Sequence, residues 1–283
     1  MKQTFKKKQI KIDGHAHIFL KSLAMQQNRR YTPKFDALPQ EYFKHLKQNK
    51  LNGCFLIQPS FLGTNNDYLI RTIKEAKLLE PNLLIKGVAV LDPSSSKQEM
   101  LKLKKSGITG IRLNLIVREL PKLHEKKWQT FLQCVEDIGW YVEVHIEGSR
   151  LQQVISELIK TNSRIVIDHF GLPDAVNNFQ YESYHFLDII KYETICVKLS
   201  APYRVYPKIS AQQAAKKCDF LAKQLFNIIG AKRLIWGSDW PWTQHEKGQT
   251  YADCIKWGER WFQNQKIEFA NVPSWLIPST TNL

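Results

Sequence analysis

The chain has 283 residues, of which 43% are hydrophobic and 24% are charged. These fractions are close to globular averages, so they exclude extended disorder and a low-complexity chain. No apolar run approaches the length of a transmembrane helix, and no apolar signal segment follows the basic N-terminus. The five cysteines form no CxxC motif, which is typical of reduced thiols, so we expect a cytoplasmic protein that does not bind membranes.

The formal net charge is +15, and the lysines are scattered apart from Lys6, Lys7 and Lys8. A basic surface can attract nucleic acid or small anions. No nucleic-acid-binding motif accompanies the charge, so the sequence favours a solvated basic surface, followed by attraction of a small anion. We therefore expect a small anionic substrate and no nucleic-acid partner. A homo-oligomer is compatible with the sequence.

Eight short segments are rich in β-branched and aromatic residues, as expected for strands buried on both faces of a parallel sheet. The expected strands span residues 9–19, 52–60, 83–93, 107–115, 139–148, 164–173, 194–204 and 233–242. Amphipathic segments with helical spacing lie between and after them. The expected helices span residues 39–50, 65–80, 95–107, 123–139, 149–162, 181–193, 211–230 and 250–263.

Strand and helix thus alternate at about 30 residues per pair, which is the size of a βα unit. Eight consecutive pairs predict a protein of the α/β class, a (β/α)8 or TIM barrel, in which residues 1–283 form a single domain. The alternative is a doubly wound open sheet, which would need a phosphate-binding glycine motif after the first strand, and none is present. The long polar stretch 18–38 predicts a lid or rim loop.

In such a barrel the active residues gather at the C-terminal ends of the strands. His15 and His17 lie two residues apart on the first expected strand, so both side chains project to the same side. Asp239 follows the last strand, where a buried carboxylate needs a partner. We expect these residues to bind a metal ion or a substrate carbonyl, with Asp239 activating water. Asp239 could instead cap a helix, but the next helix is expected only near Thr250.

Further polar residues end the fourth to seventh strands. Because neighbours on a strand face opposite ways, we expect His169 to point into the site and Asp168 to be a supporting group. His145 is a further candidate on the fifth strand. Arg112 and Arg204 suit the carboxylates of an anionic substrate, and the alternative for each is a rim salt bridge. The remaining histidines are expected on the surface: His45, His124, His185 and His245.

Six motifs stand in order between residues 10 and 245: DGHAHIF, GIRLN, VEVHIEG, VIDHFGLP, CVKLSAPYR and LIWGSDWPW. Together they resemble the amidohydrolase superfamily, and within it the branch of 2-pyrone-4,6-dicarboxylate lactonase, sulfomuconolactone hydrolase and sugar-acid lactonases. The resemblance implies a distorted barrel of the metal-dependent-hydrolase type. It also implies a hydrolase, most specifically a lactonase, that opens a small anionic or sugar-derived cyclic ester.

The same resemblance implies roles for the site residues. Asp239 would activate water, while His15, His17 and His169 polarise the substrate carbonyl. The residues that it assigns to catalysis are Asp239, His169, His15 and His17, and those assigned to substrate binding are Arg112, Arg204 and His145.

The relatives differ in their cofactor. The pyrone lactonase works without a metal, whereas other superfamily members use zinc or manganese. The fourth strand reads RLN and lacks the Lys or Glu that bridges two metals elsewhere, so no binuclear site is expected. The alternatives are therefore no cofactor or one divalent metal, zinc or manganese, held by His15, His17, His145 and Asp239.

Two departures from the family pattern bear on the substrate. Leu172 stands where the pyrone lactonase motif has an Arg, which removes one carboxylate contact. Trp242 stands where the family has a His, and we expect it to enlarge or cap the pocket rim. Two other functions stay open. One is a non-oxidative decarboxylase of aromatic acids, whose last motif usually resembles SDYP. The other is an inert barrel whose basic surface binds nucleic acid or a protein.

Overall fold

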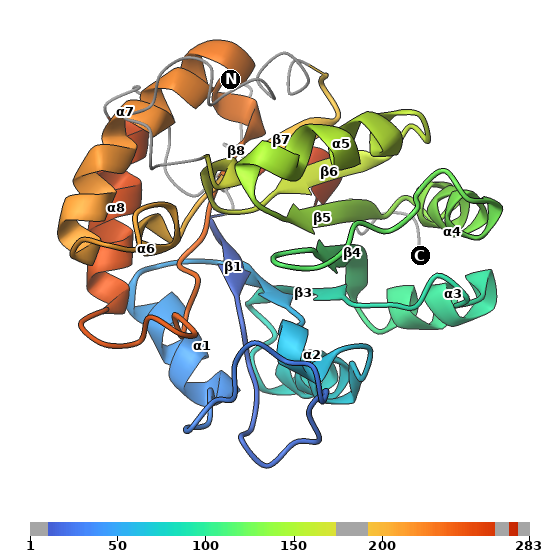
Figure 1. Cartoon of the computed structure of the whole chain (residues 1–283). Helices are drawn as coiled ribbons and strands as arrows, with labels where there is room; N and C mark the ends of the chain where they lie inside the picture. The colour runs from blue at the N-terminus through green and yellow to red at the C-terminus, as the bar shows by residue number, and fades with distance from the viewer. Residues whose placement is uncertain (1–10, 174–191, 264–271, 277–283) are drawn as a thin grey trace, which may run out of the picture.

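A computed structural model of the chain describes residues 11–173, 192–263 and 272–276. Eight parallel strands, each paired with the next along the chain, form a nearly closed barrel that helices surround (Figure 1). The predicted (β/α)8 barrel is therefore confirmed. The strands are β1 (Ile12–Ala16), β2 (Gly53–Ile57), β3 (Leu84–Ala89), β4 (Ile108–Asn114), β5 (Tyr141–His145), β6 (Arg164–Ile167), β7 (Ile195–Leu199) and β8 (Leu234–Trp236).

The helices cover the outside of the barrel with their apolar faces turned inward. They are α1 (Pro39–Gln48), α2 (Asp67–Leu79), α3 (Lys97–Lys105), α4 (Lys126–Asp137), α5 (Gly148–Ile159), α6 (Pro202–Val205), α7 (Ala211–Ile229) and α8 (Tyr251–Gln263). The short helix α6 was not expected, because the strand signal of residues 194–204 runs through it. The helix expected at 181–193 falls outside the described residues, save for its last two positions. No helix in the described ranges is long and apolar enough to cross a membrane.

The barrel closes between β1 and β8 without a regular ladder in the described chain. The two segments meet through an isolated bridge between Ala16 and Trp240. Two backbone hydrogen bonds support it: the His17 N–H donates to the Trp240 carbonyl at 2.7 Å, and the Asp239 N–H donates to the His15 carbonyl at 2.8 Å. The closure of the barrel and the placing of the first and last site residues are thus one structural feature.

Two glycines allow this close approach. A Cβ on Gly14 would lie 2.6 Å from the carbonyl oxygen of Trp236, and a Cβ on Gly237 would lie 2.7 Å from the Cβ of His15. Both distances are far below van der Waals contact, so larger residues would force β1 and β8 apart.

Asp13 joins the two sides of this closure. Its buried carboxylate accepts hydrogen bonds from the Ser238 N–H at 2.9 Å, the Tyr42 hydroxyl at 2.9 Å and the Tyr251 hydroxyl at 2.8 Å. The Ser238 hydroxyl and the His15 N–H donate to it as well. A buried carboxylate with this many donors holds structure rather than reacts. Asp13 does not belong to the residues that line the pocket described next.

Candidate active site

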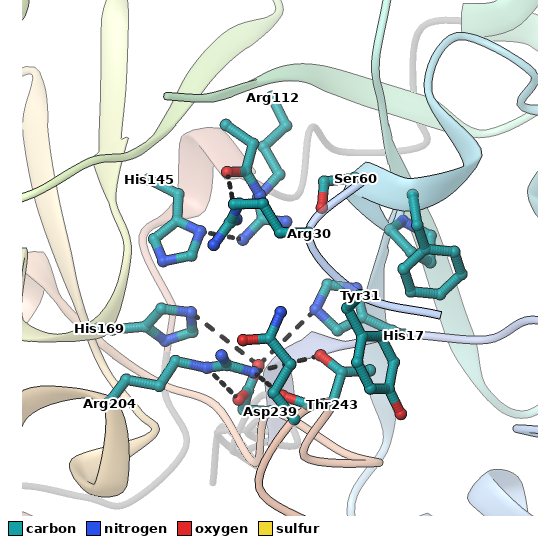
Figure 2. Close-up of a pocket in the computed structure, with 14 residues that line it drawn as sticks. His17, Arg30, Tyr31, Ser60, Arg112, His145, His169, Arg204, Asp239 and Thr243 are labelled. Carbon is teal, nitrogen blue, oxygen red and sulfur yellow. Dashed lines mark hydrogen bonds and ion pairs between the residues drawn. The ribbon is translucent and has the colours of Figure 1, made fainter. Parts of the chain in front are cut away.

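A small, polar pocket opens where the C-terminal ends of the strands meet (Figure 2). Six of the predicted site residues line it, namely His17, Arg112, His145, His169, Arg204 and Asp239. His15, the seventh, does not line the pocket but contacts three residues that do, His17, Asp239 and His169.

Asp239 is buried, and its two carboxylate oxygens have different partners. Oδ2 accepts hydrogen bonds from the Tyr203 hydroxyl at 2.7 Å and from Nε of Arg204 at 2.9 Å. Oδ1 is buried too but has no hydrogen-bond partner. The carboxylate is therefore fixed by one oxygen while the other keeps its lone pairs free. Helix α8 begins at Tyr251, so Asp239 does not cap it, as the sequence indicated.

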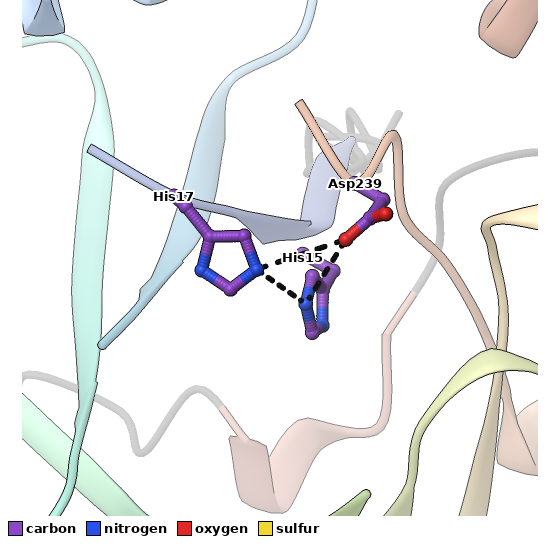
Figure 3. Close-up of side chains that lie close together, drawn as sticks. All are labelled: His15, His17 and Asp239. Atoms are coloured by element: carbon purple, nitrogen blue, oxygen red, sulfur yellow. Dashed lines mark hydrogen bonds and ion pairs between the residues drawn. The ribbon is translucent and has the colours of Figure 1, made fainter. Parts of the chain in front are cut away.

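Three histidines converge on the free oxygen (Figures 2 and 3). Nε2 of His15, His17 and His169 lies 3.5, 3.7 and 3.9 Å from Oδ1 of Asp239. Burial alone would raise the pKa of Asp239, but Arg204, His169 and the other histidines hold it well below its usual value. Asp239 is consequently a carboxylate at neutral pH.

The histidines of the site are neutral at that pH. Burial lowers the pKa of His15 and His17, and at His15 the neighbouring Lys198 lowers it further. Burial and Arg112 lower the pKa of His145, and burial brings that of His169 to about 3. Each of these imidazoles therefore carries one proton and can donate one hydrogen bond and accept another.

His169 lines the pocket, whereas Asp168 does not line it and pairs with His15 and Arg112, in line with the expectation that Asp168 is a supporting group. Strand β6 ends at Ile167, and His169 has a φ of 50°, which breaks the alternation of a strand. Asp168 Oδ1 lies 3.3 Å from Nδ1 of His15, while His169 Nδ1 shares a hydrogen bond of 2.8 Å with the Ser200 hydroxyl.

A buried network of charges lies below the pocket. Nζ of Lys198 donates to Oε2 of Glu143 at 2.5 Å and lies 3.4 Å from Oδ1 of Asp168. Burial and the Asp168 carboxylate raise the pKa of Glu143. Sequence reasoning missed Glu143, although a charged residue inside the apolar run of β5, two positions before His145, was a usable signal.

The two predicted arginines line the pocket and also bind carboxylates of the protein. Arg112 donates to Asp168 Oδ2 at 2.8 Å and to Nδ1 of His145 at 3.2 Å. Arg204 lies on α6 rather than on the preceding strand, and it bonds Asp239 and Thr243. The salt-bridge alternative thus holds for both, but the bridges are buried within the site instead of lying at the rim.

The stretch 18–38 contributes to the pocket, as predicted for a rim loop. Arg30 and Tyr31 line the pocket, and the Tyr31 hydroxyl donates to Glu246. Nη2 of Arg30 donates to Oδ1 of Asn114 at 3.2 Å. Desolvation and the charges of Arg112 and Arg204 lower the pKa of Arg30. The sequence reasoning did not single out Arg30, because a basic residue in a polar loop carries no local signal for a pocket.

Neither departure from the family pattern lies in the pocket lining. Trp242 packs against the core and donates its indole N–H to the Ser238 carbonyl at 3.2 Å, so the prediction that it shapes the rim was wrong. Leu172 also packs against the core. His245 is not a surface residue, since its half-buried ring lies 5.0 Å from that of Tyr203.

Two groups in the described chain could hold a metal ion by proximity: His15, His17 and Asp239, and His15, Asp168 and His169. His145 belongs to neither group. Its Nδ1 accepts from Arg112, and it lies across the pocket from Asp239. Within the first group, Nε2 of His15 and of His17 are already hydrogen-bonded to each other at 3.2 Å. A proton between these nitrogens occupies one of the two lone pairs, so the first group as arranged does not fit a resident metal ion.

Comparisons with known proteins agree with this fold. The family model described as amidohydrolase matches residues 12–257. The chain is 23% identical to a 2-pyrone-4,6-dicarboxylate hydrolase of Comamonas testosteroni over 81% of this chain and 76% of that protein. It is 20% identical to a 4-sulfomuconolactone hydrolase of Rhizobium radiobacter over 81% and 75% of the two chains.

A solved structure is more similar still. It is that of a probable 2-pyrone-4,6-dicarboxylic acid hydrolase from Acinetobacter baumannii with citric acid bound, at a TM-score of 0.82 and 34% identity, covering 90% of this chain and 93% of that one. Fold and site together define a barrel hydrolase in which a buried carboxylate faces a cluster of histidines. The chain belongs to the amidohydrolase family.

Proposed function

We propose that the protein hydrolyses a small lactone that carries carboxylate groups. The observation that carries this proposal is the free Oδ1 of Asp239, a buried and ionised oxygen that faces a small polar pocket. The named relatives act on anionic lactones, which supports the same substrate class here.

The reaction begins with a water molecule held by Oδ1 of Asp239. This oxygen takes a proton as the water oxygen attacks the ester carbonyl, which is general base catalysis. The same carboxyl then returns the proton to the leaving ring oxygen. The Tyr203 and Arg204 bonds to Oδ2 keep the base aligned throughout.

A donor for the developing oxyanion comes from the opposite wall. An arginine can only donate, so the bond from Arg112 makes Nδ1 of His145 an acceptor. The neutral ring therefore carries its proton on Nε2, which is free to donate to a carbonyl oxygen in the pocket. A preorganised donor of this kind stabilises the charge that forms in the transition state.

The carboxylates of the substrate are expected at the guanidinium groups of the pocket. Arg30, Arg112 and Arg204 all line it. Arg30 extends from the rim loop and bonds a neutral amide, so its charge is the least compensated of the three. Arg30 offers a positive charge in place of the family arginine that Leu172 replaces.

The test is a proton-release assay in weak buffer with pyrone carboxylates, muconolactones and aldonolactones. Lactone hydrolysis liberates an acid, so the wild type should lower the pH with at least one carboxylated lactone. We expect Asp239→Asn to reduce kcat by about 10²–10⁴-fold, the range for loss of a general base. Asp219→Asn is the matched control, because Asp219 is also paired with an arginine, Arg260 at 2.8 Å, but on α7 outside the pocket.

Silence of the wild type across the panel, with release of carbon dioxide from aromatic acids instead, would favour the decarboxylase alternative. Equal activity of wild type and Asp239→Asn on a lactone would remove Asp239 from the reaction.

A further inference from the structure

We propose that Lys198 is a positioning residue that fixes the tautomer of His15, and thereby keeps the His15–His17 pair in a form that excludes a metal ion. The inference concerns the state of the two imidazoles and does not depend on which ester is hydrolysed.

Lys198 contacts the Nδ1 edge of the His15 ring, opposite the Nε2 edge that faces His17 and Asp239. It lies on β7 with 2% of its surface exposed, and its Nζ is 3.0 Å from Nδ1 of His15. Nζ also donates to Glu143. A charged lysine has hydrogens to donate and no lone pair. Nδ1 of His15 must therefore accept, which places the single proton of this neutral ring on Nε2.

The hydrogen bond on the other side of the histidine pair, at His17, leads to the same assignment. Nδ1 of His17 lies 2.7 Å from the carbonyl oxygen of Ile57, which can only accept. His17 therefore carries its proton on Nδ1 and has a lone pair on Nε2. The 3.2 Å contact between the two Nε2 atoms then has one assignment, in which His15 donates and His17 accepts (Figure 3).

This assignment bears directly on metal binding. A metal held by His15, His17 and Asp239 would need a lone pair on Nε2 of both rings. The proton on Nε2 of His15 leaves that nitrogen without a lone pair for the metal. Only two ligand atoms are left, whereas catalytic zinc sites use three protein ligands.

The other tautomer of His15, with its proton on Nδ1, would have two carboxylate oxygens within reach as acceptors. Asp168 Oδ1 and Glu143 Oε1 lie 3.3 and 3.5 Å from Nδ1 of His15, and both oxygens are buried without a hydrogen-bond partner. A carboxylate that accepts from the far nitrogen of a histidine is the usual support of a metal-bound imidazole. Lys198 therefore determines whether His15 carries its proton on Nε2, which excludes the metal, or on Nδ1, as in a metal-bound histidine.

The first test reads the tautomers of the wild type by NMR. The protein is labelled with 15N-histidine, and long-range 1H–15N correlations distinguish protonated from unprotonated ring nitrogens. His15→Gln and His17→Gln each remove one ring and so assign the signals. We expect an unprotonated Nδ1 in His15 and an unprotonated Nε2 in His17. An unprotonated Nε2 in His15 would overturn the proposal.

The second test measures zinc affinity by competition with a chelating dye. Lys198→Met should bind zinc at least about ten-fold more tightly than the wild type, the scale on which partners of metal-bound histidines act. Lys198→Arg keeps a donor and should not tighten binding.

Arg112→Met is the matched control, because it removes a buried positive charge beside the same carboxylates without touching His15. If Arg112→Met tightens zinc binding as much as Lys198→Met, the effect is one of charge alone and the tautomer proposal is wrong. Should Lys198→Met fail to fold, the wild-type spectrum decides the question by itself.

Discussion

The contrast between the two oxygens of Asp239 is the feature on which the chemistry depends. A carboxylate held at one oxygen keeps its orientation, while the other oxygen has lone pairs available to take a proton. Here Oδ2 is held by Tyr203 and Arg204 while Oδ1 faces the histidines. The low pKa of Asp239 keeps it ionised, and the cost is a weaker base, which the orientation of the water must offset.

The pKa of His169 gives a prediction about stability. Burial lowers it to about 3 in the folded protein from 6.5 in the unfolded chain. Between these values the unfolded chain binds a proton that the folded protein does not. The free energy of unfolding should therefore fall as the pH drops from 6.5 toward 3, by about 1.4 kcal/mol per pH unit for this group.

The measurement compares urea unfolding of the wild type and His169→Gln from pH 8 to pH 4. The difference between the two proteins isolates the histidine. We expect it to be constant above pH 7 and to shrink below pH 6. A difference that does not change with pH would show that His169 keeps its ordinary pKa.

Single residues differ in how far the sequence predicts them. His17, Asp239 and Arg112 follow from position alone, because strand ends of a barrel share one face. The partners that set their state do not, since Lys198 meets His15 and Arg30 meets Asn114 across the barrel. Such pairings depend on the register of distant strands, which no local pattern encodes.

At the scale of elements, the sequence predicts which segments are strands better than where they stop. The apolar run of 164–173 continues past the end of β6, because buried loop residues such as Phe170 are as apolar as strand residues. The apolar run of 194–204 likewise continues past the end of β7, so α6 was not expected from the sequence. Backbone turns with positive φ at His169 and Asp239 produce the inward side chains. Asp and His are enriched at positive φ, but most residues of these types do not adopt it, so the sequence does not locate the turns.

The closure between β1 and β8 is predicted to tolerate no side chain at Gly14. An added methyl would meet the Trp236 carbonyl at 2.6 Å, so Gly14→Ala should cost about 1–3 kcal/mol of stability. It should also lower kcat/KM by ten-fold or more, because displacement of a catalytic group by an ångström can cost about 10²-fold.

Gly139→Ala provides the control for this variant. Gly139 has a φ of 73° and no atom within 4 Å of an added Cβ. The variant should lose about 1–2 kcal/mol from left-handed strain while its kcat/KM is unchanged. Equal activity of Gly14→Ala and Gly139→Ala would show that the closure does not position the site. Thermal unfolding and steady-state kinetics measure both quantities.

At the scale of the whole molecule, the net charge of +15 surrounds a pocket lined by three arginines. A field of this sign concentrates anions at the pocket, and salt screens it over about 10 Å at 0.1 M. We expect kcat/KM for a carboxylated lactone to fall several-fold between about 0.02 and 0.5 M salt. An uncharged lactone of similar size should show no such fall, and parallel salt curves for the two would exclude steering.

The arrangement of groups on the pocket walls also predicts that hydrolysis is stereoselective. The free oxygen of Asp239 lies on one side and His145 with Arg112 on the other (Figure 2). Water held by Asp239 can approach a bound ester from one face of its planar carbonyl only. A ring substituent that points toward Asp239 would displace that water, whereas its mirror image would not. A racemic lactone should therefore be consumed until one enantiomer is spent, with the other left behind.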